Sequence, residues 1–264
     1  MLLKDTWDFP RFKKEFYQFT GLDLECYKDK QMERRITQLF TREGYDGLSV
    51  FFKALKSDKE VLHKFYNYLT INTSVFYRDS KIYDYLQKKA LPDTLKKFDQ
   101  LNIWSVGCSH GEEPYTLALI LDELNSLKKV KIYASDIDDK ALEMAKEACY
   151  TPNQLEKVPG NVFKNAFTER NGLYYLNPKY KEVVKFQKQN FLSPIYKDMS
   201  RMQMALCRNV FIYFKTDIQE WIIEQISGLI PKGGYFVIGC AEFINKPERF
   251  NLERQIPSIY LKTG

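Results

Sequence analysis

The sequence predicts an α/β protein in which an all-helical N-terminal domain precedes a doubly wound, mostly parallel sheet that carries a small β insertion. Two observations support this prediction. In roughly the first 75 residues, apolar side chains recur at helical spacing. After about residue 99, short apolar strands alternate with helices, the pattern of parallel strands joined by crossover helices. The 264 residues, 44% of them hydrophobic, are enough for one small and one larger domain.

Residues 1–75 are expected to form a domain of four short helices. In the first helix, four phenylalanines recur at helical spacing: Phe9, Phe12, Phe16 and Phe19. Gly21 is a natural stop for that helix. The other three helices are expected at Tyr27 to Thr41, around Val50 to Leu55, and at Val61 to Leu69. Residues 76–98 are interpreted as a linker helix.

The second of these helices carries a basic stripe. Gln31, Arg35, Gln38 and Arg42 fall on one polar face, and Arg34 lies beside them. The opposite face is apolar and is expected to pack inside the helical domain. The stripe is a candidate docking surface for an acidic partner, with an ordinary solvated helix face as the alternative.

Residues 99–264 are expected to hold the sheet. The elements read from the pattern are strands at Asn102–Val106, Val130–Ser135, Met204–Leu206 and Tyr235–Ile238, and helices from Pro114 to Leu124, Asp139 to Ala148 and Asp217 to Leu229. Between the two halves, residues 150–190 contain three prolines and two strand-like runs, Leu173–Leu176 and Val183–Phe186. This segment is predicted to be the small β insertion.

Composition excludes several classes of protein. The five cysteines form no CxxC pair and the two histidines are too few for a His-rich cluster, so neither a disulfide framework nor a metal site is expected. No apolar run is long enough to span a membrane, and charges stand where a signal peptide would need its apolar core. A cytoplasmic protein without membrane insertion is therefore expected. The net charge of +6 suits an acidic partner without identifying it.

The turn after the first predicted strand is a candidate ligand site, because doubly wound sheets bind ligands there. Gly107 and Gly111 allow close approach of the backbone, but their spacing is not that of a dinucleotide fingerprint. Glu112 and Glu113 would repel a pyrophosphate and would suit a ligand carrying a sulfonium and an ammonium group. Their alternative role is to complement the helix dipole.

Asp136 closes the second predicted strand, 25 residues after Gly111. Nucleoside-binding sheets place a carboxylate at this point against the ribose hydroxyls. An acidic residue at a strand end is common, so Asp136 alone is weak evidence for a ligand site. The preceding glycine turn strengthens that evidence. Together the two features predict a nucleoside-containing ligand.

Two further segments extend the pattern: Leu69-Thr-Ile-Asn-Thr-Ser-Val-Phe-Tyr-Arg78 and Cys207-Arg-Asn-Val-Phe-Ile-Tyr-Phe214. With W-S-x-G-C-S-x-G-E-E-P-Y-T, A-S-D-I-D and L-x-P-K-G-G-Y-F-V-I-G-x-x-E, they occur in the order and register of one family. The chain resembles the CheR family of chemotaxis receptor methyltransferases over nearly its whole length. The resemblance implies a Rossmann-like domain that transfers a methyl group from S-adenosylmethionine to receptor glutamates. The products would be a glutamate methyl ester and S-adenosylhomocysteine.

The resemblance also implies roles for individual residues. Cofactor-binding positions are Asn72, Ser74, Arg78, Gly107, Glu113, Asp136, Asn190, Phe191, Arg208 and Asn209. Arg78 is expected to hold the methionine carboxylate, a pairing that suits the guanidinium fork. Arg208 and Tyr213 are expected beside the transferring methyl group, where they would orient the acceptor; a surface ion pair and a core aromatic are the alternatives. Arg78, Arg208 and Tyr213 are thus the candidate catalytic residues.

The resemblance implies a partner as well, the cytoplasmic helical bundle of chemotaxis receptors, docked through Arg34, Arg35 and Arg42. The short Glu169–Leu173 segment resembles the family members that are not tethered to a receptor tail. Three positions depart from the family pattern: His110, Gln203 and Cys240.

Two other functions compete with this interpretation. A nucleic-acid methyltransferase would fit a pI near 8.8, but Asn209-Val-Phe-Ile lacks the prolines of the usual base-holding loop, so no nucleic-acid partner is expected. A non-catalytic scaffold that binds S-adenosylmethionine or its product is the second alternative. Intact Arg78, Asp136, Arg208 and Tyr213 argue against it.

Overall fold

A computed structural model describes residues 7–70, 74–190, 192–193 and 201–264. Its contacts divide the chain into two compact units. The N-terminal unit comprises Met1–Asn72 together with Tyr213–Glu220, and the larger unit comprises Thr73–Ile212 and Trp221–Gly264. The sequence interpretation put Tyr213–Glu220 wholly within the 99–264 domain, whereas the contacts of this segment group it with the N-terminal helices.

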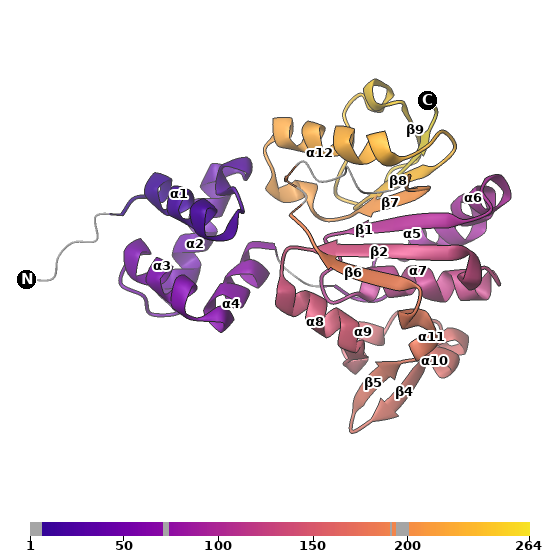
Figure 1. Cartoon of the computed structure of the whole chain (residues 1–264), viewed down its shortest axis with the longest axis horizontal. Helices are drawn as coiled ribbons and strands as arrows, with labels where there is room; N and C mark the ends of the chain where they lie inside the picture. The colour runs from indigo at the N-terminus through magenta and orange to yellow at the C-terminus, as the bar shows by residue number, and fades with distance from the viewer. Residues whose placement is uncertain (1–6, 71–73, 191, 194–200) are drawn as a thin grey trace, which may run out of the picture. The chain divides into compact units, whose positions relative to one another are not determined.

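The N-terminal unit contains the four expected helices (Figure 1). They are α1 (Phe9–Thr20), α2 (Asp29–Arg42), α3 (Leu48–Ser57) and α4 (Lys59–Thr70), with a 3-10 turn η1 (Leu24–Cys26) between the first two. Asp8 caps α1 by accepting from the Arg11 amide at 2.9 Å, and Gly21 ends the helix at φ 73°. The core of the unit is aromatic, with the buried rings of Phe12, Phe16, Phe51 and Phe65 packed together.

The larger unit is built on a seven-stranded sheet of order β6-β2-β1-β7-β8-β10-β9. Its strands are β1 (Leu101–Val106), β2 (Val130–Asp136), β6 (Val184–Lys188), β7 (Met204–Cys207), β8 (Tyr235–Ile238), β9 (Leu252–Ile256) and β10 (Ile259–Lys262). The first five strands in this order are parallel, and β10 is antiparallel to both neighbours. The predicted doubly wound, mostly parallel sheet is confirmed.

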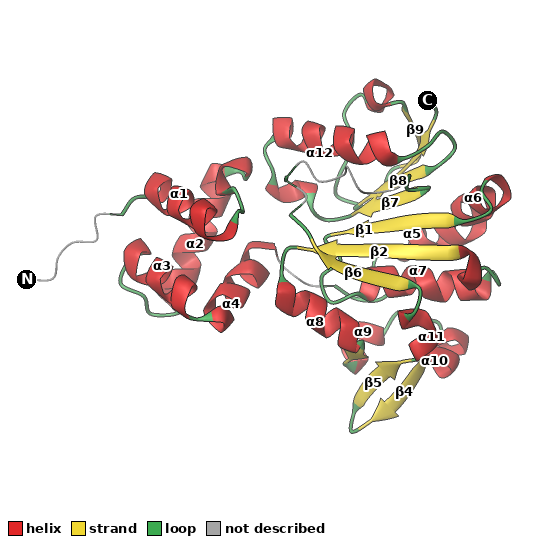
Figure 2. Cartoon of the chain, in the orientation of Figure 1, coloured by secondary structure: helices red, strands yellow, loops and turns green. Residues whose placement is uncertain are grey.

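Helices surround this sheet (Figure 2). They are α5 (Ser80–Tyr85), the π-helical turn η2 (Leu86–Ala90), α6 (Leu91–Lys97), α7 (Glu112–Glu123), η3 (Leu127–Lys129), α8 (Asp139–Glu147) and η6 (Pro247–Phe250). Two further helical elements, η5 (Phe211–Tyr213) and α12 (Thr216–Leu229), cross the sequence boundaries between the two units. α7 and α8 pack on β2 and β6. The β7 and β8 strands are buried along their whole length, as expected for parallel strands covered on both faces. None of the described helices is both long and apolar enough to cross a membrane.

The expected β insertion is smaller than its predicted range. It contains β3 (Cys149–Tyr150), α9 (Pro152–Leu155), α10 (Gly160–Ala166), β4 (Phe167–Arg170), β5 (Leu173–Leu176) and α11 (Pro178–Lys181). Its antiparallel strands lie in the order β3-β5-β4, and the β4–β5 hairpin stands away from the main sheet (Figure 2). Assigning Val183–Phe186 to this insertion was wrong, because that run forms β6, which pairs in parallel with β2 at the edge of the main sheet.

Candidate functional site

The candidate site lies at the carboxyl ends of β1, β2 and β7. The chain leaves β1 toward β2 on one side, while β7 pairs with the other side of β1. Such a reversal of strand order opens a crevice at the carboxyl edge of a sheet. The glycine turn after β1, Asp136 at the end of β2, and the Arg208–Asn209 pair after β7 therefore converge at one edge.

The glycine turn has a backbone conformation that requires glycine. Gly107 and Gly111 have φ of 68° and 90°, values that L-residues rarely adopt. A side chain on Gly107 would also meet Val210 at 3.2 Å. The turn is fixed to β2 because the amides of Gly107 and Cys108 both donate to the Ser135 carbonyl, at 2.8 and 2.9 Å.

Asp136 is buried at the end of β2, with only 9% of its surface exposed. One carboxylate oxygen accepts from the Ser109 amide at 2.8 Å and the other from the Asp138 amide at 3.1 Å. Burial raises the pKa of Asp136, and these backbone amides partly oppose the increase. Beside it, the buried Ser109 hydroxyl lacks a hydrogen-bond partner within the described parts of the chain. A carboxylate with lone pairs to spare and an unused hydroxyl fit a ligand that bears a diol, such as the ribose of S-adenosylmethionine.

The raised pKa of Asp136 predicts a pH-dependent stability of the cofactor-free protein. The folded state keeps the proton to a higher pH than the unfolded state, so stability falls as pH rises from about 4 through the folded-state pKa. Asp136→Asn lacks this titration. The free energy of unfolding of the variant, relative to wild type, should increase over this interval and then level off. Urea unfolding at a series of pH values measures the difference; a constant difference across the interval would contradict the prediction.

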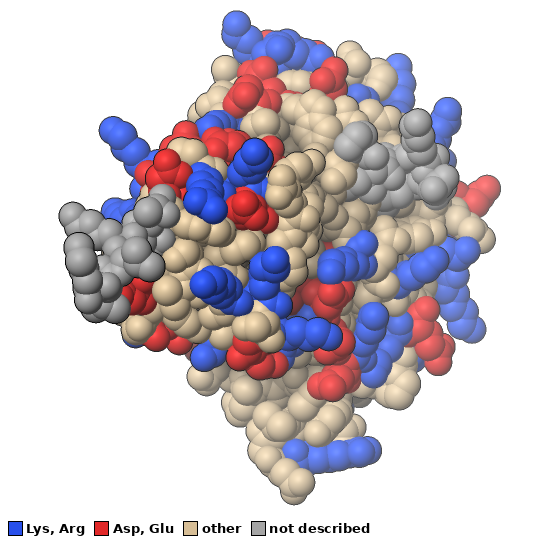
Figure 3. Space-filling view, turned by 60° about the vertical axis from the view of Figure 1, so that its left-hand side comes forward, with Lys and Arg blue, Asp and Glu red and all other residues tan. Residues whose placement is uncertain are grey.

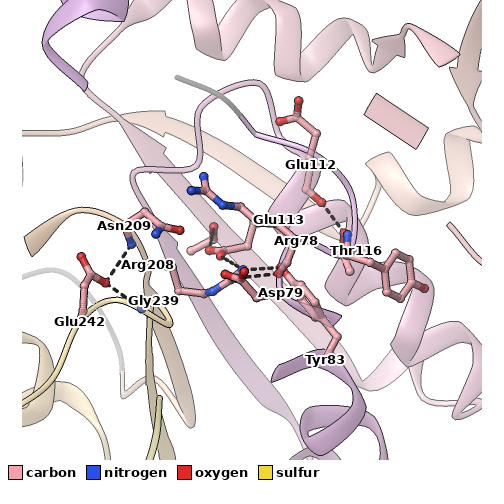
Figure 4. A network of polar contacts seen from close by, with 12 residues as sticks. Arg78, Asp79, Tyr83, Glu112, Glu113, Thr116, Arg208, Asn209, Gly239 and Glu242 are labelled. Atoms are coloured by element: carbon pink, nitrogen blue, oxygen red, sulfur yellow. Dashed lines mark hydrogen bonds and ion pairs between the residues drawn. The ribbon is translucent and has the colours of Figure 1, made fainter. Parts of the chain in front are cut away.

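Arg208 joins three segments at this edge (Figure 4). Its Nη1 donates to the Tyr83 hydroxyl at 2.9 Å and to Glu113 at 3.1 Å. Its Nη2 donates to the Arg78 carbonyl at 2.7 Å and to Asp79 at 2.8 Å. The guanidinium also lies 5.2 Å from the centroid of the Tyr83 ring. The side chain, 3% exposed, therefore fastens the segment carrying Arg78 to the glycine turn through Glu113.

The environment of Arg208 keeps it charged. Burial alone would lower the pKa of the guanidinium, but Tyr83, Glu113 and Asp79 together raise it. All four Nη hydrogens have intramolecular acceptors, and the remaining Nε is buried without a partner in the described structure. The geometry thus engages Arg208 in holding the Arg78 segment. Its expected part in orienting an incoming glutamate stays a prediction.

The two acids of the glycine turn have different surroundings. Glu113 accepts from the Ser105 hydroxyl at 2.7 Å and pairs with Arg208. Glu112 is fully buried and accepts from the Gln154 side chain at 2.8 Å. The sequence suggested that both acids would face a cationic ligand. In the structure Glu113 is joined to Arg208 at the site, whereas Glu112 fastens α9 to the start of α7.

Glu242 is a site residue that sequence reasoning did not single out. Its carboxylate accepts from the amides of Gly239 at 2.7 Å, Asn209 at 2.9 Å and Phe211 at 2.8 Å. It is 7% exposed, and burial raises its pKa against the lowering effect of these amides. Glu242 thereby fixes the backbone that follows Arg208 (Figure 4). The available signal was its place at the end of the last family motif, G-x-x-E.

Left-handed backbone recurs in the three segments that meet at this edge. Tyr77 and Asp79 flank Arg78 at φ 53° and 63°, Ser109 has φ 49°, and Asn209 has φ 59°. For a bulky residue such as tyrosine this conformation is an outlier. Strain of this kind persists where the surroundings impose it, and it concentrates at functional sites. Here Arg208 holds the segment around Arg78, Asp136 holds the Ser109 amide, and Glu242 holds the Asn209 amide.

Other expected site residues are distributed as follows. Asn72 and Phe191 lie outside the described residues, and Ser74 is half-buried at the start of the larger unit. Asn190 follows β6, and its side chain accepts from the Leu192 amide at 3.1 Å. Tyr213, 9% exposed, belongs to the N-terminal unit.

The three departures from the family pattern have separate surroundings. Gln203 accepts from the Asn102 amide at 2.7 Å, which places it at the amino end of β1, the opposite edge from the site. The His110 carbonyl accepts from the Tyr150 hydroxyl at 3.0 Å, and Cys240 is exposed. Throughout the described residues, no group of three or more His, Cys, Asp or Glu side chains could hold a metal ion.

Comparisons with known proteins agree with these features. Residues 7–70 match the CheR methyltransferase all-alpha domain, and residues 72–258 match the CheR methyltransferase SAM binding domain. A chemotaxis protein methyltransferase of Listeria monocytogenes is 32% identical over 262 residues, covering 96% of this chain and 99% of the relative. One from Borreliella burgdorferi is 30% identical over 264 residues, covering 96% and 93%.

Among solved structures, an O-methyltransferase family protein from Burkholderia thailandensis is similar over 81% of this chain and 62% of its own, with a TM-score of 0.42 and 10% identity. The family assignment depends on the domain matches and the full-length relatives, which confirm the resemblance seen in the motifs. The chain belongs to the CheR family of chemotaxis protein methyltransferases, and its larger domain is an S-adenosylmethionine-binding domain.

Proposed function

We propose that this protein methylates glutamate side chains on the cytoplasmic part of chemotaxis receptors, giving glutamate methyl esters. The observation that carries the proposal is the junction of Asp136, Glu113 and Arg208 at the carboxyl edge of the sheet, in a chain that matches CheR domains over nearly its full length. When bound, S-adenosylmethionine supplies a methyl group on an electrophilic sulfonium.

The reaction makes modest demands on the protein. The side-chain carboxyl of glutamate has a reference pKa of about 4.3, so the acceptor is already an anionic nucleophile at neutral pH. The protein must align the acceptor with the methyl group and exclude water, and it needs no general base.

The proposed roles of the residues follow from these demands. Asp136 accepts from the ribose hydroxyls, and Arg78 pairs with the methionine carboxylate. Arg208 and Glu113 hold the segment that presents Arg78. Tyr213 orients the acceptor. The remaining proposed cofactor contacts are Asn72, Ser74, Gly107, Asn190, Phe191 and Asn209.

Transfer of labelled methyl groups to receptor fragments tests the proposed reaction. Incubation with labelled S-adenosylmethionine and cytoplasmic receptor fragments should give protein-bound label that is released by mild base, because a methyl ester hydrolyses whereas an N-methyl group does not. Fragments with the acceptor glutamates changed to alanine are the matched control and should remain unlabelled. Base-stable label would instead indicate nitrogen methylation.

The proposed docking surface for the receptor is the exposed part of the basic stripe on α2, formed by Arg34 and Arg42. Arg34 is exposed, and the Arg42 side chain is 62% exposed beside Glu43. Arg35 differs from them because its Nη2 donates to the Tyr68 carbonyl of α4. Figure 3 shows basic and acidic side chains intermixed over the face that it draws, so the docking proposal depends on these specific arginines.

Charge reversal at Arg34 tests this surface. Arg34→Glu should raise the Michaelis constant for a receptor fragment severalfold at low ionic strength, since rim charges steer association. The effect should shrink as salt is added, with cofactor affinity unchanged. Lys128→Glu, an equal charge change at an exposed position of η3, is the control. If the two variants had the same Michaelis constant, the receptor would dock elsewhere.

The β4–β5 hairpin supports the proposal of an untethered enzyme. Its turn consists of Asn171 and Gly172 alone, at φ 53° and 76°. Both residues have positive φ, as in the tight type I′ connection. This hairpin carries no extension that could hold a receptor tail.

A further inference from the structure

The segment around Phe214 is bound by the N-terminal helices, although it follows the β7 strand in sequence. Tyr27 and Phe214 form an isolated antiparallel β-bridge, and their ring centroids lie 4.6 Å apart. Two backbone hydrogen bonds of 3.0 Å complete it, from the Lys28 amide to the Tyr213 carbonyl and from the Lys215 amide to the Cys26 carbonyl. The backbone on both sides of Phe214 is thus fixed to the N-terminal unit.

Charged groups reinforce this attachment. Lys215 lies 3.0 Å from Asp29, the first residue of α2. Asp29 also accepts from Lys13 of α1 at 2.8 Å, and the Lys13 side chain is only 6% exposed. Hydrogen bonds from these two lysines lower the pKa of Asp29. The carboxylate therefore links α1, the start of α2 and the segment after Tyr213.

The ring of Tyr213 meets an arginine of the same unit. The Arg35 guanidinium lies 6.0 Å from the centroid of the Tyr213 ring and 5.1 Å from that of Tyr68. Its Nη2 donates to the Tyr68 carbonyl, so α4 fixes the position of the guanidinium. A cation held over an aromatic face attracts the ring and restricts its orientation. Tyr213 is therefore constrained through its backbone by the β-bridge and through its ring by Arg35.

We infer that Arg35 acts as a positioning residue for the phenol of Tyr213, so that an arginine of the N-terminal helical unit influences the rate of methyl transfer. This inference rests on the proposed function, in which Tyr213 orients the acceptor glutamate. The inference assigns different roles to two arginines of α2. Arg34 attracts the receptor electrostatically, and Arg35 positions the side chain of Tyr213.

Steady-state kinetics with a receptor fragment distinguish positioning from docking. Arg35→Gln should lower kcat by about tenfold, in line with the sensitivity of transfer reactions to small misplacements. The Michaelis constant for the fragment and its dependence on salt should stay at wild-type values. Lys30→Gln removes an exposed charge from the same helix and should leave both constants unchanged. Thermal unfolding of each variant checks that the fold is retained.

A double-mutant cycle supplies the decisive readout, because groups that act as a unit give non-additive effects. Tyr213→Phe alone should lower kcat, and adding Arg35→Gln in that background should cause no further decrease. Equal losses from Arg35→Gln in both backgrounds would overturn the inference. So would a raised Michaelis constant with normal kcat, which indicates docking.

The same measurements separate this inference from the proposed function. A Tyr213→Phe protein with full kcat would overturn the positioning role while ester formation by the wild-type protein still stood. If the wild-type protein gave no base-labile ester on receptor fragments, the proposed function itself would fail, and the inference with it.

Discussion

Arg208→Ala is expected to destabilise the protein more than any other change of a proposed catalytic residue. The free energy of unfolding should fall by about 3 kcal/mol, because removing the buried guanidinium leaves two partly buried carboxylates without their counter-charge. Asp79 and Glu113 would lose their ion pairs at 2.8 and 3.1 Å, and the Arg78 carbonyl would lose its donor. Part of the cost is relieved by water, because the Asp79 side chain is 30% exposed. Urea unfolding measures the loss.

The functional effect of Arg208→Ala should appear first in cofactor affinity. Without Arg208, the segment carrying Arg78 is no longer fastened to Glu113, so the dissociation constant for S-adenosylhomocysteine should rise about tenfold, or ~1.4 kcal/mol. Arg208→Lys keeps the charge and loses the fork geometry, so it should fall between wild type and alanine. Arg254→Ala, at an exposed position on β9, is the control and should change stability by less than about 0.5 kcal/mol. A stable Arg208→Ala protein with normal affinity would contradict the role given to this residue.

Glu242→Ala is expected to have an effect of similar size. The change would remove the shared acceptor of the Gly239, Asn209 and Phe211 amides. An unsatisfied buried donor costs about 1–3 kcal/mol, so with water entering the vacated space a total loss of about 3 kcal/mol is expected. The turnover number should also fall, since the freed backbone carries Asn209 and leads directly into Tyr213. Urea unfolding and methyl transfer to receptor fragments measure the two effects.

Glu242→Gln refines this test. The amide retains one acceptor oxygen and points an NH2 group at backbone donors, so its stability should lie between those of wild type and alanine. Glu248→Ala, at an exposed position in η6, is the matched control. If Glu242→Gln were as stable as the wild-type protein, acceptance by both oxygens could not be what holds this backbone.

Much of the fold was accessible from sequence because its signals are local. The alternation of apolar strands with helices predicted the parallel sheet, and the spacing of phenylalanines predicted α1 through its stop at Gly21. β6 was assigned to the wrong sheet because a short apolar run specifies a strand and leaves its partner open. β4 was missed because its last three residues are polar and exposed, which gives no alternating pattern.

The residues of the candidate site also fall into two groups, those that local sequence could suggest and those whose contacts depend on distant parts of the chain. Gly107, Glu113 and Asp136 could be proposed from sequence because they occupy fixed places next to strands, where the topology of a doubly wound sheet brings ligand-binding groups. The partners of Arg208 could not be found, since Tyr83 and Glu113 are 125 and 95 residues away from it. Its motif marked the position, and only the folded chain shows that its hydrogen-bond donors are already engaged.

The amino-acid sequence alone was sufficient to predict the fold class, the family and the edge of the sheet where the proposed cofactor-binding residues gather, because these depend on periodicity, turn chemistry and motif order. Tertiary structure alone decided that Arg208 and Glu242 hold the backbone of the site and that Tyr213 belongs with the N-terminal helices. The physical reason is that hydrogen bonds and ion pairs form between groups brought together by the whole topology. Local sequence can indicate that a polar side chain lies in a buried segment. Which group it bonds to depends on how the whole chain packs.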